Sequence, residues 1–343
     1  MKKFVAVMLA VLTLAVGFVT FAACKDDKKP QGGGENVTVN VYLPDGTPAL
    51  ALAKAMTEGV SAEGYDVDFK IIAAGDIGKV FAATNADLAI MPTIGAATNY
   101  KKGVGIQLVS TNVFGNLYIV GVNAPKEEVS LADLKGKTVM TTAATTIQLF
   151  EYLLKENNIK YVEGDAADKE SDTVYLKSYD DGSQITQALA AAGSGEAYGV
   201  LGEPQVTVCQ SKVSAAKILV DFQAEWEKLT SFDGYPQASL IAKKSFAEAN
   251  GAFVNAFAAA LESNAAWLAS ADNIAKFKAA LVSYNETHSD YQTTLANAAL
   301  TVDTVQRCNL GYRSAADVKT SVKDYIKRLS GTDLDDGFFY AAA

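Results

Sequence analysis

The sequence predicts an α/β protein of two lobes, each a mostly parallel sheet flanked by helices. Strand-like and helix-like segments alternate along the chain from residue 37, which is typical of parallel sheets covered by helices. The alternation passes through two cycles, and continuous apolar segments separate them. A folded body of about three hundred residues also exceeds one ordinary hydrophobic core, which favours two lobes.

The first cycle begins with β-branched residues that alternate with polar ones and end at a turn, Pro44-Asp45-Gly46. Thr47 can cap the helix that follows, and Pro48 suits its first turn. We expect strands at 37–43, 67–72, 87–91 and 106–111, and helices at 49–60, 77–84 and 95–102.

The second cycle repeats the rhythm after residue 131. We expect strands at 138–142, 173–177, 198–201 and 216–220, and helices at 146–157, 183–192 and 203–212.

Two apolar segments, 116–122 and 237–242, stand beside the second cycle, and we expect them to be the crossings that join the lobes. The tail from Ser245 is Ala-rich and its large apolar residues fall at helical spacing. We expect it to pack on the first lobe and to supply no strand. The predicted domains are therefore lobe one, 37–121 plus 236–343, and lobe two, 122–235, with a cleft between them.

The N-terminus has the parts of a secretory signal: Lys2 and Lys3, an apolar run, and the ending Phe21-Ala-Ala-Cys24. A membrane-spanning helix is the alternative, but the run is at the lower edge of the roughly 20 residues needed. The ending resembles the lipobox of bacterial lipoproteins, and charged residues follow it directly. We expect residues 1–23 to be a signal peptide and 24–36 a lipidated Cys24 with a flexible linker. The protein would then be extracytoplasmic and anchored to the cell membrane.

Composition and motifs exclude several functions. The net charge is −9 and falls further when Lys2 and Lys3 are removed, which argues against nucleic-acid binding. His288 is the single histidine, with no second His or Cys at ligand spacing, so we expect no metal. No nucleophile elbow, phosphate-binding glycine loop or paired-cysteine motif is present, so no cofactor and no enzymatic activity is expected. A disulfide between Cys209 and Cys308 is permitted, although two buried free thiols are favoured.

A family resemblance is carried by five further segments. They are Pro-Asp-Gly-Thr-Pro-Ala-Leu-Ala-Leu-Ala at 44–53, Ala-Asp-Leu-Ala-Ile-Met-Pro-Thr at 86–93, Asn-Leu-Tyr-Ile-Val at 116–120, Ser-Leu-Ala-Asp-Leu-Lys-Gly-Lys-Thr-Val at 130–139 and Gly-Glu-Pro-Gln-Val at 202–206. With the lipoprotein signal, this order resembles ABC-transporter substrate-binding proteins of the type II periplasmic-binding fold. The most similar branch takes up nitrate, sulfonate, taurine and thiamine pyrimidines.

The resemblance implies a solute-binding protein that captures a small organic molecule between two lobes and delivers it to an ABC permease with its ATPase. One alternative is an enzyme of related fold that acts on a thiamine-pyrimidine compound. The lone His288 and the separated cysteines argue against it, because such enzymes use histidine and a cysteine cluster near the site. The other alternative is an extracellular sensor domain, which we disfavour because no membrane segment or signalling domain follows Phe338-Phe339-Tyr340.

Open α/β sheets bind ligands at the carboxyl ends of their strands. This rule selects ten candidate ligand-binding residues: Asp45, Gly46, Thr47, Thr93, Phe114, Asn116, Thr142, Thr145, Glu203 and Tyr235. Each also has a structural interpretation. Asp45-Gly46 is a common turn pair, the threonines can be helix caps, and Glu203 suits the first turn of a helix.

The charge of these loops predicts the class of ligand. They contain Asp45 and Glu203, with Asp233 nearby, and no Lys or Arg. An anion beside an uncompensated carboxylate is disfavoured by about 4 kcal/mol at an effective dielectric of about 20. Phe114 and Tyr235 suit a flat ring. We therefore expect a nitrogen-containing ligand that is neutral or cationic, although helix N-termini keep an anion possible.

Overall fold

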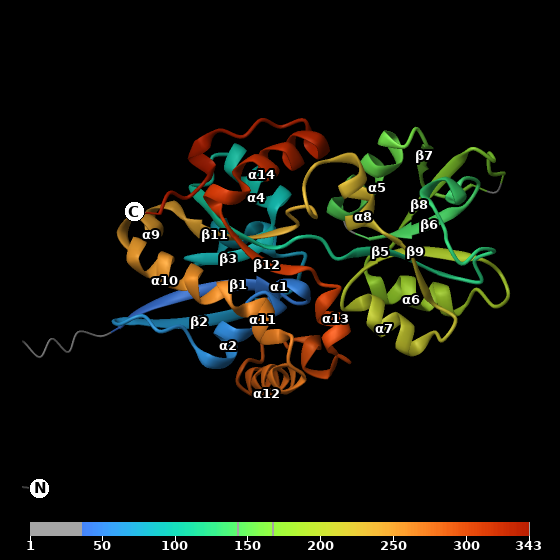
Figure 1. Ribbon diagram of the computed structural model, residues 1–343. Coiled ribbons are helices and arrows are strands. Elements are labelled where there is room, and N and C mark those ends of the chain that lie inside the picture. Colours follow the sequence, from blue (N-terminus) through green and yellow to red (C-terminus); the bar gives the residue numbers. More distant parts are fainter. Residues whose placement is uncertain (1–35, 143, 167, 343) are drawn as a thin grey trace, which may run out of the picture. The chain divides into compact units, whose positions relative to one another are not determined.

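A computed structural model describes residues 36–142, 144–166 and 168–342, without the side chains of residues 144 and 145 (Figure 1). The predicted signal peptide, the lipidated Cys24 and all of the linker but Asn36 lie outside these residues. No helix in the described ranges is both long and apolar enough to cross a membrane.

The first sheet has six strands in the order β12-β4-β11-β3-β1-β2. The strands β1 to β4 share one direction, whereas β11 and β12 run against it. Their bounds are β1 (Val37–Pro44), β2 (Tyr65–Ile72), β3 (Leu88–Pro92), β4 (Ile106–Val113), β11 (Ala238–Lys243) and β12 (Leu310–Ser314).

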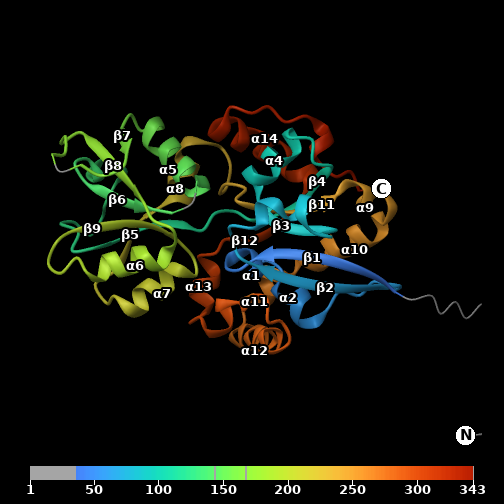
Figure 2. The same cartoon turned by 180° about the vertical axis from the view of Figure 1, so that it is seen from behind.

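Helices of the first cycle follow these strands. The expected helix 49–60 is divided in two by a turn at residues 51–52. The observed elements are α1 (Thr47–Leu50), α2 (Ala53–Glu58), η1 (Ile77–Lys79), α3 (Val80–Ala83) and α4 (Thr93–Lys101). In both views α4 and α2 lie on opposite faces of the sheet (Figures 1 and 2).

The second sheet has the order β10-β5-β9-β6-β8-β7, and only β5 runs against the other strands. The bounds are β5 (Leu117–Val122), β6 (Thr138–Thr141), β7 (Lys160–Glu163), β8 (Thr173–Ser178), β9 (Ala197–Gly202) and β10 (Lys217–Asp221). The edge strand β7 was not predicted, because most of its residues are exposed and leave no apolar alternation.

Helices α5 (Ala144–Glu156) and α8 (Phe222–Leu229) cover one face of the second sheet (Figures 1 and 2). Helices α6 (Gly182–Ala190) and α7 (Gln205–Lys212) cover the other, and η2 (Leu131–Leu134) precedes β6. Asp181 and Asp221 cap α6 and α8 by accepting hydrogen bonds from backbone N–H groups, which fixes where these helices begin.

The tail packs on the first sheet, with the Phe253 ring 4.7 Å from that of Tyr65. Contrary to our expectation, the tail also supplies a strand, since β12 pairs with β4. That strand is short, half-buried and irregular in register, so it has no clear strand pattern. The other tail elements are α9 (Lys244–Ala249), α10 (Gly251–Glu262), α11 (Asn264–Leu268), α12 (Ala271–Thr287), η3 (Thr294–Asn297), α13 (Val302–Gln306), α14 (Ala315–Ser330) and η4 (Asp336–Phe338).

The segments expected as crossings are strands inside the two sheets, β5 and β11. The chain passes between the sheets through residues 114–116 and returns through residues 230–237. These connections pack closely: a Cβ atom on Gly234 would lie 2.3 Å from the backbone oxygen of Phe114. Gly115 has φ +103°, and its Cβ would lie 2.6 Å from the Tyr235 ring. Both positions therefore require glycine.

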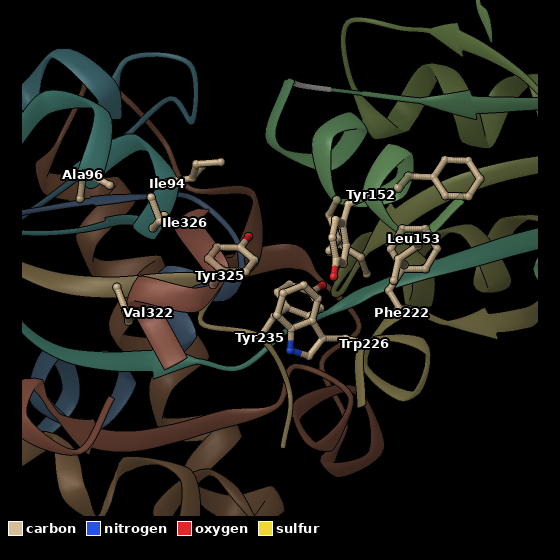
Figure 3. Close-up of a cluster of buried hydrophobic side chains, with 14 of the residues drawn as sticks. Ile94, Ala96, Tyr152, Leu153, Phe222, Trp226, Tyr235, Val322, Tyr325 and Ile326 are labelled. Atoms are coloured by element: carbon tan, nitrogen blue, oxygen red, sulfur yellow. The ribbon is translucent and has the colours of Figure 1, made fainter. Parts of the chain in front are cut away.

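A buried aromatic cluster extends from the second sheet to the first (Figure 3). Tyr152 of α5 and Trp226 of α8 have ring centroids 5.5 Å apart, and Trp226 lies 5.5 Å from Tyr325 of α14. Tyr235, from the returning connection, stacks on Tyr325. Arg328 of α14 also donates a 2.8 Å hydrogen bond to the Tyr152 hydroxyl. The side chains of the two sheets thus share one continuous core.

Candidate binding site

A cleft of about 560 Å³ is formed where strands of both sheets reach their carboxyl ends. Asp45 follows β1, Asn116 follows β4, Thr142 follows β6 and Glu203 follows β9. The cleft is thus located where the strand-end rule places a ligand. Of the predicted residues, it is lined by Asp45, Gly46, Thr47, Asn116, Thr142 and Glu203.

Three of these residues hydrogen-bond to one another. The Thr47 hydroxyl donates to the Glu203 backbone carbonyl at 2.6 Å. The Asn116 amide nitrogen donates to the same carbonyl at 2.9 Å and to the Thr47 hydroxyl at 2.7 Å. Both protons of that amide are therefore used, and the bonds join a loop of the first sheet to a loop of the second.

The Glu203 carboxylate is fully buried and paired with a cation. Arg307, at the end of α13, donates from Nε at 2.6 Å, and the Thr207 backbone N–H donates at 3.1 Å. Arg307 follows Glu203 by 104 residues, so local sequence patterns could not reveal the pair. The premise that Glu203 brings an uncompensated charge to the ligand was wrong.

Asp45, unlike Glu203, has no cationic partner among the described residues. Its carboxylate accepts hydrogen bonds from the Thr294 backbone N–H at 2.8 Å, from the Thr294 hydroxyl at 2.7 Å and from the Thr293 hydroxyl. Tyr291 lines the cleft beside it, and burial together with the Asp45 carboxylate raises the pKa of that phenol. Asp45 is thus held in place by neutral donors.

A second carboxylate in the cleft, Asp181, was not predicted. Hydrogen bonds from the Ser183 hydroxyl and the Gln184 backbone N–H hold the pKa of Asp181 below its usual range. Its sequence signal was an aspartate directly before a helix that follows β8. Within the described ranges no Lys or Arg lines the cleft, so these two carboxylates give it a negative character.

The other predicted residues lie elsewhere. Thr93 is fully buried at the start of α4 and shares a 2.8 Å hydrogen bond with Ser239. Phe114 lines a separate cavity, with the Arg313 guanidinium 4.6 Å from its ring centroid. Tyr235 is buried in a cavity of about 80 Å³ that adjoins the cleft. Thr145 lies in α5, and its side chain is outside the described part.

The histidine and the cysteines do not line the cleft, although the Cys308 sulfur lies 3.7 Å from the Thr47 hydroxyl. His288 ends α12 and stacks on Tyr284 at 3.9 Å. Cys209 and Cys308 are free, buried thiols in different clusters, and burial raises the pKa of Cys308 to about 12. Among the residues that the structure describes, no three His, Cys, Asp or Glu side chains gather as a metal site.

Comparison with known proteins identifies the family. Residues 61–273 match the family model described as NMT1/THI5 like. The chain belongs to this family. No curated protein sequence matches this NMT1/THI5-like protein.

Solved structures share the fold of this NMT1/THI5-like protein. An ABC transporter from Parabacteroides distasonis is 22% identical, with 90% of this chain and 100% of that chain covered and a TM-score of 0.66. The periplasmic aliphatic sulphonate binding protein SsuA from Escherichia coli is 13% identical, with coverage of 89% and 92% and a TM-score of 0.61. The ligand binding component of an ABC-type import system from Staphylococcus aureus, with zinc bound, is 12% identical, with coverage of 89% and 97% and a TM-score of 0.58. The predicted type II periplasmic-binding fold is confirmed.

Proposed function

We propose that this NMT1/THI5-like protein is the extracytoplasmic substrate-binding component of an ABC importer, tethered to the membrane through Cys24. It captures a small organic molecule in the cleft and delivers it to a permease. The observation that carries the proposal is the cleft itself, which strand ends of both sheets line together. Two of the solved structures of the same fold are described as an ABC transporter and as a component of an ABC-type import system, and the third as a periplasmic binding protein, which supports this function.

Ligand capture would proceed by closure of the two lobes about the connections 114–116 and 230–237. A ligand shifts such an equilibrium only as far as it binds the closed form better. Asp45 belongs to the first-sheet side of the cleft and Asp181 to the second, so a ligand that bridges them favours closure. Solution scattering should then show a smaller radius of gyration at saturating ligand, and an unchanged profile would contradict the clamp.

The charge of the cleft favours a nitrogen-containing ligand that is neutral or cationic. The negative character of the cleft comes from Asp45 and Asp181, because Glu203 is paired with Arg307. A sulfonate close to either carboxylate would be repelled by about 4 kcal/mol at an effective dielectric of about 20. The ligand class therefore differs from the sulphonate named for the E. coli structure.

Two measurements test the proposal. Native mass spectrometry of protein purified without denaturation should reveal a bound small molecule. Calorimetry against taurine, an alkanesulfonate, nitrate and aminopyrimidines should show binding of a nitrogen heterocycle. Micromolar binding of a sulfonate or nitrate alone would refute the ligand class and leave the transport function standing. A protein that carries no small molecule after purification from cells that import such solutes, and that binds none of the tested compounds, would count against the transport function itself.

A further inference from the structure

A small cavity of about 80 Å³ adjoins the proposed binding cleft. Five residues line both spaces: Pro48, Leu117, Thr146, Gln237 and Ala238. The remaining wall is largely apolar and aromatic, and consists of Pro92, Ile94, Leu149, Tyr235 and Tyr325. Two polar groups of the lining residues, one on Gln237 and one on Tyr235, are buried without hydrogen-bond partners in the described structure, which is unusual for a folded protein.

The first of these groups is the Gln237 side-chain oxygen, and a chain of hydrogen bonds fixes its orientation. A backbone carbonyl only accepts, so the Asn116 amide nitrogen must face the Glu203 carbonyl, 2.9 Å away. The Asn116 oxygen then accepts from the Gln237 amide nitrogen at 2.6 Å. Gln237 is left with its oxygen Oε1 buried and unbonded within the described structure.

The second group is the Tyr235 hydroxyl. The Tyr235 ring is held by Tyr325, which stacks on it at 6.0 Å and 15°, and by the edge of Trp226 at 6.1 Å (Figure 3). Burial raises the pKa of Tyr235 well above its usual value, so the phenol keeps its proton. The backbone N–H groups of Asn116 and Leu117 lie close enough to the phenol oxygen to offset part of this rise, but its proton has no acceptor among the described residues and can be donated to a ligand.

The two groups are complementary in their demands. Gln237 Oε1 only accepts, whereas the Tyr235 hydroxyl can donate. A neutral group that presents an N–H donor beside an acceptor matches these two demands, and a primary carboxamide is the simplest example. A carboxylate or sulfonate has no N–H and would bring a negative charge against the Gln237 oxygen.

We propose that this small cavity is the specificity subsite of the cleft, and that it takes a neutral carboxamide-like group which donates to Gln237 and accepts from Tyr235. The inference rests on the proposed ligand-binding function. It attributes the choice of ligand to two uncharged residues, Gln237 and Tyr235, and it gives their buried polar groups a function.

The test uses three probes of nearly equal shape. Nicotinamide has the N–H donor and the acceptor, 3-acetylpyridine keeps only the acceptor, and nicotinate is anionic. We expect calorimetry to show that the native protein binds nicotinamide at least tenfold more tightly than either other probe. Equal affinities, or no binding of nicotinamide, would overturn the subsite. A small molecule found in the cleft by native mass spectrometry would still leave the proposed function standing.

A variant of Gln237 and a matched control test the role of the Gln237 oxygen as the acceptor. Gln237→Met keeps the length of the side chain and should reduce the preference for nicotinamide over 3-acetylpyridine to below threefold. Gln210→Met, the same change outside the cleft on α7, should leave it intact. A preference that survives Gln237→Met would contradict the assignment.

Tyr235→Phe provides a second test, in case Gln237→Met disturbs the Asn116 contact. It should weaken both nicotinamide and 3-acetylpyridine about tenfold, because both use the acceptor. The melting temperature of the unliganded protein should change little, because the hydroxyl proton that is removed has no acceptor. A variant that lost stability but kept affinity would show that the hydroxyl is structural.

Discussion

Replacing Arg307 with methionine should destabilise the protein more than any change to a surface ion pair. Arg307 is the cation that faces the fully buried Glu203 carboxylate, at 2.6 Å. Methionine keeps much of the side-chain volume but removes the charge and the hydrogen bonds. The Glu203 charge would then lie buried beside the neutral Thr207 alone.

The size of the effect follows from burial. Breaking a buried pair by removing one partner costs about 3–5 kcal/mol. Arg307 is 30% exposed, so water can partly replace it, and we take the lower end, about 3 kcal/mol. At about 2–4 °C per kcal/mol for a large domain, the melting temperature should fall by about 6–12 °C.

Urea unfolding and calorimetry of three variants test this reasoning. The double variant Glu203→Gln/Arg307→Met should be more stable than Arg307→Met, because no uncompensated charge remains. Arg313→Met breaks a pair whose side chains are 43% and 83% exposed, so it should cost less than about 1 kcal/mol. The reasoning is refuted if Arg307→Met costs no more than Arg313→Met, or if the double variant is no better than the single one.

Three further predictions concern other parts of the chain. Cys24→Ala should move the protein out of the membrane fraction or leave an uncleaved precursor on an immunoblot; mature wild-type protein found wholly in the medium would contradict the anchor. Cys308 should resist a thiol reagent until the protein unfolds, because burial raises its pKa to about 12 and its thiolate is scarce; rapid labelling in native buffer would show the site to be open. Burial also raises the pKa of Asp221, so the folded state binds this proton more tightly than the unfolded state, and stability is lost as pH rises through the raised pKa. Asp221→Asn keeps a good helix cap and should be at least as stable as wild type at pH 7, with the difference vanishing below about pH 3.5 in thermal melts; a constant difference at all pH values would exclude a charge effect.

The strand-end rule predicted much of the cleft from sequence. It selected Thr47, Asn116 and Glu203 from three distant segments, and the structure brings them within hydrogen-bonding distance. The rule concerns backbone position, so it could not tell that the Glu203 side chain turns away from the ligand towards Arg307. Phe114 fails for the same reason, since its loop was chosen correctly but its ring faces another cavity.

Sheet membership was predictable where the apolar pattern was strong. The strands β1 and β9 have largely buried cores and were expected within two residues of their ends. The strands β7 and β12 are mostly exposed or half-buried, and their pairing is determined by neighbours that are remote in sequence. Such strands have no local signal, because their stability comes from tertiary contacts.

The strand order of the first sheet has a consequence for how the chain folds during synthesis. β3 and β4 do not pair with each other, because β11 lies between them and pairs with both. The edges of β3 and β4 that face β11 therefore stay open until residue 243 has left the ribosome, and the other edge of β4 stays open until residue 314, whereas the second sheet is complete at residue 221. The region that is encoded in the middle of the gene can be finished first, and the region that begins the protein is finished last.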